Sequence, residues 1–252
     1  MPFGLYWDTD DPFHYVRRHQ IHGEAGANGA MDDYLIIGGE DHKTGQADDG
    51  EERFARLESW ARERFPEMGA VEHRWAGQVM ESFDGLPFIG RNPMDYENVF
   101  IATGFSGLGM TNGTLAGMII GDLIRGRENP WSELYHPGRK AKSLSSLRQF
   151  AKENLNVASQ YAALVTPGEV QSVDEIPLGE GAVIRRGMRK VAVYRAPQGV
   201  LHEMSAICPH LGCVVQWNAT EKTWDCPCHG SRFRAAGDVL NGPANQNLER
   251  LT

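Results

Sequence analysis

The sequence predicts an α+β fold, with a mixed first domain joined by a helical linker to a small antiparallel all-β domain. Up to about residue 140, short apolar runs alternate with stretches of helical periodicity, whereas only short strands and turns follow residue 166. A stretch rich in proline, glycine and charge at residues 128–140 lies between the two patterns. We therefore divide the chain into residues 1–140, 141–165 and 166–252.

The elements of the first domain follow from their periodicity and end signals. Residues 34–39 are an apolar run that ends in glycines, which predicts a strand, and the acidic residues from position 48 begin a helix that reaches residue 65. Residues 72–80 and 99–103 are predicted as further strands, and residues 111–125 as a helix.

One helix is predicted for the linker, and antiparallel strands are predicted for the last domain. Apolar residues between positions 147 and 162 roughly trace one helical face, so we expect a connecting helix that packs between the domains. Residues 182–186, 190–194 and 200–206 are predicted as antiparallel strands.

Composition limits the function classes. With 41% apolar and 23% charged residues, the chain is typical of soluble globular proteins. No segment reaches the ~20 apolar residues of a membrane span, and the amino terminus lacks the features of a secretory signal, so we expect a cytoplasmic protein. The net charge of −8 lies wholly before residue 166, because residues 166–252 hold nine basic and nine acidic side chains. This balance argues against nucleic-acid binding, and a partner that docks on the first half is expected to be basic.

Two short motifs near the carboxyl end contain all four cysteines. Cys208-x-His210 and Cys226-x-x-His229 are separated by 15 residues and offer two thiolates and two imidazoles. A 2Fe-2S cluster needs two protein ligands per iron, which this set supplies. Zinc is the alternative, but zinc motifs usually place two to four residues between paired ligands, and six residues of ligating type exceed its four positions.

These motifs resemble the Rieske family, in which two cysteines hold one iron and two histidines hold the other. The resemblance implies that Cys208 and Cys226 bind one iron and that His210 and His229 bind the second. It also implies a disulfide between Cys213 and Cys228, which would be unusual in the cytosol.

The same resemblance assigns roles around the cluster. Ser231 matches a serine that hydrogen-bonds a bridging sulfide, and residues 242–244 match the loop that covers the cluster. Leu211 matches a shielding side chain of the first motif. Phe233 stands where high-potential members carry a tyrosine, so we expect a lower reduction potential here.

A second signal is the glycine-rich string at residues 103–111, which lies between a predicted strand and a predicted helix. Together with residues 84–90 it resembles the carboxy-terminal part of the D-amino-acid oxidase and sarcosine oxidase superfamily, which binds FAD. The resemblance implies a partial flavoprotein domain in which the helix dipole faces the flavin ring. The flavin-facing candidates that it implies are Pro87, Ile89, Gly90, Gly104, Phe105, Ser106, Gly107, Gly109 and Met110.

Two other interpretations of the string stay open: a plain strand-to-helix turn, and a dinucleotide fingerprint, which the absence of a following βαβ unit disfavours. The chain shows no glycine fingerprint for the adenine half of FAD. Thr111 and Gly107 stand where relatives carry the cation that holds a substrate carboxylate, which disfavours an amino-acid substrate. Substrate and catalytic residues therefore stay unassigned.

The combined signals predict an oxidoreductase in which a small-molecule substrate reacts at flavin and electrons pass to the 2Fe-2S cluster. From there they would reach a redox partner protein or a small-molecule acceptor. A non-catalytic Rieske ferredoxin-like carrier with a remnant or docking domain is the alternative. A zinc-bound sensor is the third hypothesis.

Overall fold

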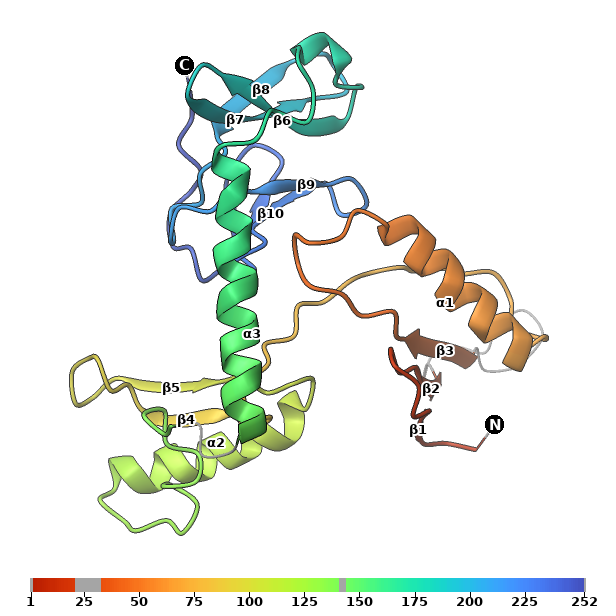
Figure 1. The fold of residues 1–252 in the computed structure, drawn as a ribbon. Coiled ribbons are helices and arrows are strands. Elements are labelled where there is room, and N and C mark those ends of the chain that lie inside the picture. Colours follow the sequence, from red (N-terminus) through yellow and green to blue (C-terminus); the bar gives the residue numbers. More distant parts are fainter. Residues whose placement is uncertain (1, 21–32, 141–143, 252) are drawn as a thin grey trace. The chain divides into compact units, whose positions relative to one another are not determined.

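The computed structural model describes residues 2–20, 33–140 and 144–251 and shows the mixed helices and strands of an α+β protein (Figure 1). The chain divides into two compact units. Residues 1–76 and 160–252 form the first unit, and residues 77–159 form the second. The predicted α+β class is confirmed.

The first unit begins with a three-stranded antiparallel sheet and a helix. Strand β1 (Leu5–Trp7) pairs with β2 (Tyr15–Gln20), which pairs with β3 (Asp33–Gly38). Helix α1 (Gly50–Arg64) has two acidic residues in its first turn and two basic residues in its last, which suits the helix dipole at both ends. Both β3 and α1 were predicted from the sequence.

The strand predicted at residues 72–80 is wrong, because this segment has no regular secondary structure. Nearly all of its side chains are exposed, on both faces of the backbone. A strand needs a neighbour for its backbone hydrogen bonds and a covered face for its apolar side chains. The segment has neither among the described residues.

The second unit is built on a strand pair and a helix. Strand β4 (Phe88–Arg91) runs antiparallel to β5 (Phe100–Thr103), and helix α2 (Gly109–Ile124) packs against them. The side chains of Ile89 and Ile119 are fully buried in this contact. The predicted strand and helix are confirmed, with the helix beginning two residues earlier.

An ion pair joins the turn before β4 to the segment that follows α2. Arg139 binds both carboxylate oxygens of Asp84, at 2.8 Å from Nε and 2.7 Å from Nη2. The same guanidinium donates to the carbonyls of Leu86 and Pro87 and lies 4.0 Å from the ring centre of Phe88. One arginine therefore holds the whole Asp84–Phe88 turn.

The predicted linker is a helix, α3 (Leu144–Gln160), continued by a 3-10 turn (Tyr161–Leu164). Residues 141–143, where the linker was predicted to begin, lie outside the described residues. No residue of α3 is buried. The predicted helix is confirmed, and its packing between the domains stays a prediction.

The carboxy-terminal part is all β apart from one short 3-10 turn, Val173–Glu175. One sheet has the order β6-β7-β8, with β6 Glu180–Arg186, β7 Arg189–Arg195 and β8 Leu201–Ser205. The other has the order β12-β11-β10-β9, with β9 Gln216–Asn218, β10 Thr223–Asp225, β11 Arg232–Arg234 and β12 Val239–Asn241. The predicted strands at 182–186, 190–194 and 200–206 are confirmed. Fully buried Trp224 and Phe233 lie on β10 and β11, beside the loops that carry the cysteines.

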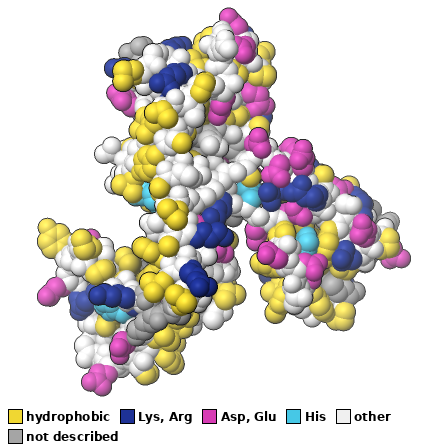
Figure 2. Space-filling model, viewed as in Figure 1, with side chains coloured by type: hydrophobic (Ala, Val, Ile, Leu, Met, Phe, Trp, Pro, Cys, Tyr) yellow, Lys and Arg dark blue, Asp and Glu magenta, His cyan; other side chains and the backbone are white. Residues whose placement is uncertain are grey.

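Acidic and basic side chains are interspersed over the face drawn in Figure 2. Within the described ranges, no helix is both long enough and apolar enough to cross a membrane.

Candidate metal centre and flavin-facing loop

Two loops of the second β-sheet region carry the cysteines and histidines, and they have the same backbone pattern. In the first, Cys208 N donates to Cys213 O at 2.8 Å, and Gly212 N donates to Cys208 O at 2.9 Å. In the second, Cys226 N donates to Ser231 O at 2.8 Å, and Gly230 N donates to Cys226 O at 3.0 Å. Each loop thus closes on its first cysteine.

Glycine is required at the fifth position of both loops. Gly212 and Gly230 have φ values of 80° and 77°, a left-handed backbone that side chains with a Cβ rarely adopt. The sequences Cys-x-His-x-Gly and Cys-x-x-His-Gly therefore fold into one kind of turn, which presents a cysteine at its start and a histidine in its middle.

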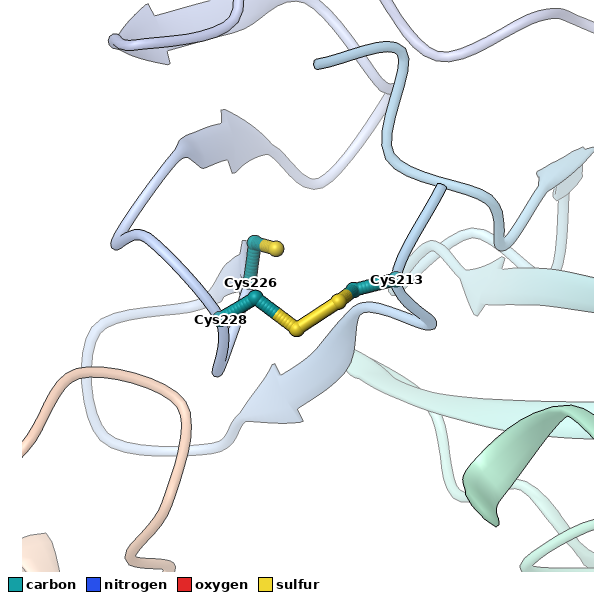
Figure 3. Close-up of side chains that lie close together, drawn as sticks. All are labelled: Cys213, Cys226 and Cys228. Atoms are coloured by element: carbon teal, nitrogen blue, oxygen red, sulfur yellow. A yellow bond between two sulfur atoms is a disulfide. The ribbon is translucent and has the colours of Figure 1, made fainter. Parts of the chain in front are cut away.

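The structure joins Cys213 and Cys228 in a disulfide between the two loops, the pairing that the resemblance implied (Figure 3). The sulfur of Cys226 lies within 4.8 Å of the Cys213 and Cys228 sulfurs. Cys208 and Cys226 are free thiols and each is 1% exposed. The two cysteines left for a metal are thus the two that were predicted as ligands.

The two histidines lie together and face inward. Their ring centres are 4.9 Å apart, and the Nδ1 atoms of His210 and His229 are both buried without a hydrogen-bond partner. A buried unpartnered ring nitrogen costs free energy unless something binds it. Two such nitrogens beside two buried thiols fit the ligand set of a 2Fe-2S cluster.

The thiols perturb each other strongly. The Cys208 sulfur accepts a hydrogen bond from the Cys226 thiol, which lowers the pKa of Cys208 below its ordinary value. The same hydrogen bond, together with burial, raises the pKa of Cys226. Burial and the neighbouring His210 lower the pKa of His229, which favours the neutral ring that binds a metal.

Ser231 is fully buried and connects three parts of the site. Its hydroxyl hydrogen-bonds the Cys208 sulfur and accepts from Ala244 N at 3.0 Å, so it ties the 242–244 loop to the first cysteine. Phe233 is also fully buried, whereas Leu211 is 57% exposed, as a residue at the tip of the loop would be.

Side chains from outside the loops also contact them, and the sequence did not predict the contacts of Tyr161 and Gln46. Tyr161 Oη donates to Leu211 O at 2.6 Å, and Gln46 Nε2 donates to Pro227 O at 2.8 Å. Neither side chain belongs to a recognisable motif. The Gln46 contact joins residues 181 positions apart, which no local pattern can indicate.

The glycine-rich string lies where it was predicted, between β5 and the start of α2. The side chain of Met110 is 88% exposed, and a Cβ on Gly107 or Gly109 would meet no atom within 4 Å. Helix α2 has no side-chain cap, so its first backbone N–H groups face this open space. Phe105 and Ser106 lie at the turn itself and are partly exposed. The open backbone fits the approach of an anionic group.

The other flavin-facing candidates are placed differently. Pro87, Ile89, Gly90 and Gly104 are all buried. The Ile89 side chain belongs to the contact with α2, and a Cβ on Gly90 would lie 3.0 Å from the Pro137 ring. These residues support the strand pair, and the open face is provided by residues 105–110.

Comparison with known proteins assigns both regions. The family model described as Rieske 2Fe-2S domain matches residues 166–252. Residues 166–252 are a Rieske domain. The family model described as FAD dependent oxidoreductase matches residues 1–123, so the chain joins part of that family's domain to the Rieske domain. The Rieske domain carries a 2Fe-2S cluster as its cofactor.

Individual proteins are similar to all or part of this chain. The Bacillus subtilis (strain 168) protein YhfW, named as a Rieske 2Fe-2S iron-sulfur protein, is 33% identical over 99% of this chain and 47% of its own length. The cytochrome b6-f complex iron-sulfur subunit of Synechococcus sp. (strain JA-3-3Ab) is 56% identical over 19% of this chain and 28% of its own length. The solved structure of the Rieske protein PetC3 from Synechocystis PCC 6803 matches 29% of this chain and 74% of the PetC3 chain, with 32% sequence identity and a TM-score of 0.27.

The chain spans 47% of YhfW and 28% of the Synechococcus subunit. The activity, substrates and partners of the whole protein are therefore treated below as proposals.

Proposed function

We propose that this chain is the electron-transfer part of a flavin-dependent oxidoreductase, in which electrons pass from flavin to a 2Fe-2S cluster. Cys208 and Cys226 would hold one iron, and His210 and His229 the other. The observation that carries this proposal is the pair of buried, unpartnered histidine nitrogens beside two buried free thiols, on twin loops.

The side chains around the site each have a defined task. A 2Fe-2S cluster supplies a one-electron donor and acceptor. The two cysteines supply negative charge, while the histidines bind as neutral rings and so favour a higher potential than four thiolates would. The disulfide between Cys213 and Cys228 holds the loops at a fixed separation. His210 and His229 are half-buried, so their outer edges are the part of the site closest to solvent and to a redox partner.

The flavin part of the proposal rests on the β5–α2 turn. Backbone N–H groups at the start of α2, next to Gly107 and Gly109, would stabilise negative charge that develops on a flavin ring. Residues 105–110 would face the ring, and the buried residues Pro87, Ile89 and Gly90 would hold the strand behind them.

A flavin-binding and reduction experiment tests this proposal. The purified protein, in the longest form that the cell makes, should copurify with flavin, and photochemical reduction of that flavin should reduce the cluster. Absence of flavin in a preparation with an intact cluster would refute the oxidoreductase proposal.

The second candidate is a Rieske ferredoxin-like electron carrier whose first half is a docking or remnant domain. The burial of Pro87, Ile89, Gly90 and Gly104 favours it, because these residues serve the fold without any ligand. The flavin measurement above separates the two candidates. For either one we propose a cytoplasmic location and a redox partner protein or a small-molecule acceptor.

A further inference from the structure

A loop of the flavoprotein part, residues 43–49, touches the second cluster loop within the first unit. A Cβ on Gly45 would lie 2.8 Å from Pro227 N and 2.9 Å from the Asp225 carbonyl oxygen. Gly45 also has a φ of +68°, which a residue with a Cβ rarely adopts. The close approach of the two backbones therefore requires glycine at this position.

This approach brings the next residue onto a specific carbonyl. Gln46 Nε2 donates to Pro227 O at 2.8 Å, and the contact is partly buried. The Pro227 carbonyl belongs to the same peptide group as Cys228 N–H. That N–H, together with His229 N–H, hydrogen-bonds the Cys226 sulfur.

Two hydrogen bonds therefore meet at one peptide group. Gln46 donates to its carbonyl oxygen, on Pro227, and its N–H, on Cys228, donates to the Cys226 sulfur. A donor on the carbonyl polarises the peptide and makes its N–H a stronger donor, by about 10–30% for hydrogen bonds in series. A hydrogen bond from that N–H to a sulfur ligand stabilises the reduced cluster more than the oxidised one, because reduction adds negative charge.

We propose that Gln46 is a positioning residue for the cluster, through which the flavoprotein part raises the cluster's reduction potential by way of the Pro227–Cys228 peptide. The inference rests on the proposed ligand role of Cys226. Through this contact, a residue in the first half of the chain changes the reduction potential of the cluster in the second half.

The test is a redox titration of the full chain, with the cluster followed by EPR, in Gln46→Met and Gln46→Ala. Methionine keeps most of the side-chain volume and removes the donor. The equilibrium with a redox mediator should shift about 1.3- to fivefold toward the oxidised cluster in both variants, as expected for a 10–30% change in a hydrogen bond to a charged group. Asn154→Ala is the matched control, because Asn154 makes a similar amide-to-carbonyl bond to Phe150, at 2.8 Å, in α3.

A backbone variant tests the same contact independently. Gly45→Ala should shift the equilibrium in the same direction, because its Cβ pushes the loop away from Pro227. Gly187→Ala should not, since Gly187 has a similar φ of +62° and open space around it.

Amide hydrogen exchange of the segment that contains Cys228 gives a second readout. Exchange should be faster in Gln46→Met than in the wild type and unchanged in Asn154→Ala. An unchanged potential in Gln46→Met, or unchanged exchange at Cys228, overturns the role of Gln46 while leaving the cluster in place. A wild-type chain without a Rieske EPR signal would instead refute the proposed function.

Discussion

At the scale of single residues, the potential of the centre depends on which groups donate to the two cysteine sulfurs. Cys208 accepts from Ser231 and from His210 N–H, and Cys226 accepts from the N–H groups of Cys228 and His229. Phe233, fully buried on the neighbouring strand, has no hydroxyl to add. The sequence resemblance placed Phe233 where high-potential Rieske proteins carry tyrosine.

Phe233→Tyr should therefore raise the reduction potential. One added hydrogen bond contributes about 0.5–1.5 kcal/mol, which shifts the equilibrium with a redox mediator about two- to tenfold toward the reduced cluster. A redox titration followed by EPR measures the reduction potential of the cluster in this variant. Phe150→Tyr in α3, where the ring is 53% exposed, is the control. A potential that Phe233→Tyr leaves unchanged would reject the role assigned to this position.

At the scale of elements, the twin loops separate two tasks of cysteine. Cys208 and Cys226 are free and buried, while Cys213 and Cys228 are joined to each other. Replacing a ligand removes the metal, whereas replacing the disulfide removes a restraint on the unfolded chain.

The double variant Cys213→Ser and Cys228→Ser should still assemble the cluster under anaerobic conditions. Its free energy of unfolding should fall by about 3 kcal/mol, the value expected for a link across 15 residues. Cys208→Ser should lose iron and sulfide. Iron analysis and urea unfolding measure both effects, and a double variant without iron beside a loaded Cys208→Ser would reverse the assignment.

The Asp84–Arg139 ion pair should matter for the second unit. The hydrogen bonds from Arg139 lower the pKa of Asp84 below its ordinary value of 3.8. A lowered carboxyl pKa stabilises the folded state above the unfolded pKa, and this stabilisation is lost as the pH falls through the folded value.

Asp84→Asn should accordingly destabilise the protein near neutral pH by about 2 kcal/mol, as expected for hydrogen bonds to a charged group. The difference from the wild type should shrink as the pH falls below 3.8. Thermal unfolding against pH measures it, with Asp95→Asn on an exposed turn as control. A difference that stays constant through this range would show that the charge of Asp84 contributes nothing.

How far the sequence predicts each element depends on whether its signal is local. Helix α1, helix α2 and strands β6 to β8 follow from periodicity and end residues, and their existence was predicted. The segment 72–80 was predicted as a strand but has no partner strand among the described residues, and only the fold decides whether a partner is present. The contacts of Gln46 and Tyr161 with the cluster loops join distant parts of the chain and left no pattern to read.

At the scale of the whole molecule, the chain combines a Rieske domain with part of a flavoprotein domain. The loop contact at Gly45 and Gln46 lies within the compact unit that also contains the cluster loops. In this account the first half supplies the flavin-facing turn and a hydrogen bond toward the cluster, and the second half supplies the cluster ligands.

The central claim is that Cys208, His210, Cys226 and His229 hold a 2Fe-2S cluster. Low-temperature EPR and metal analysis of the anaerobically purified chain test it most directly, in the wild type and in His210→Ala. We expect equal amounts of iron and acid-labile sulfide and a Rieske-type signal in the reduced wild type, with the signal lost in His210→Ala. Zinc in place of iron and sulfide, or an unchanged signal in His210→Ala, would contradict it.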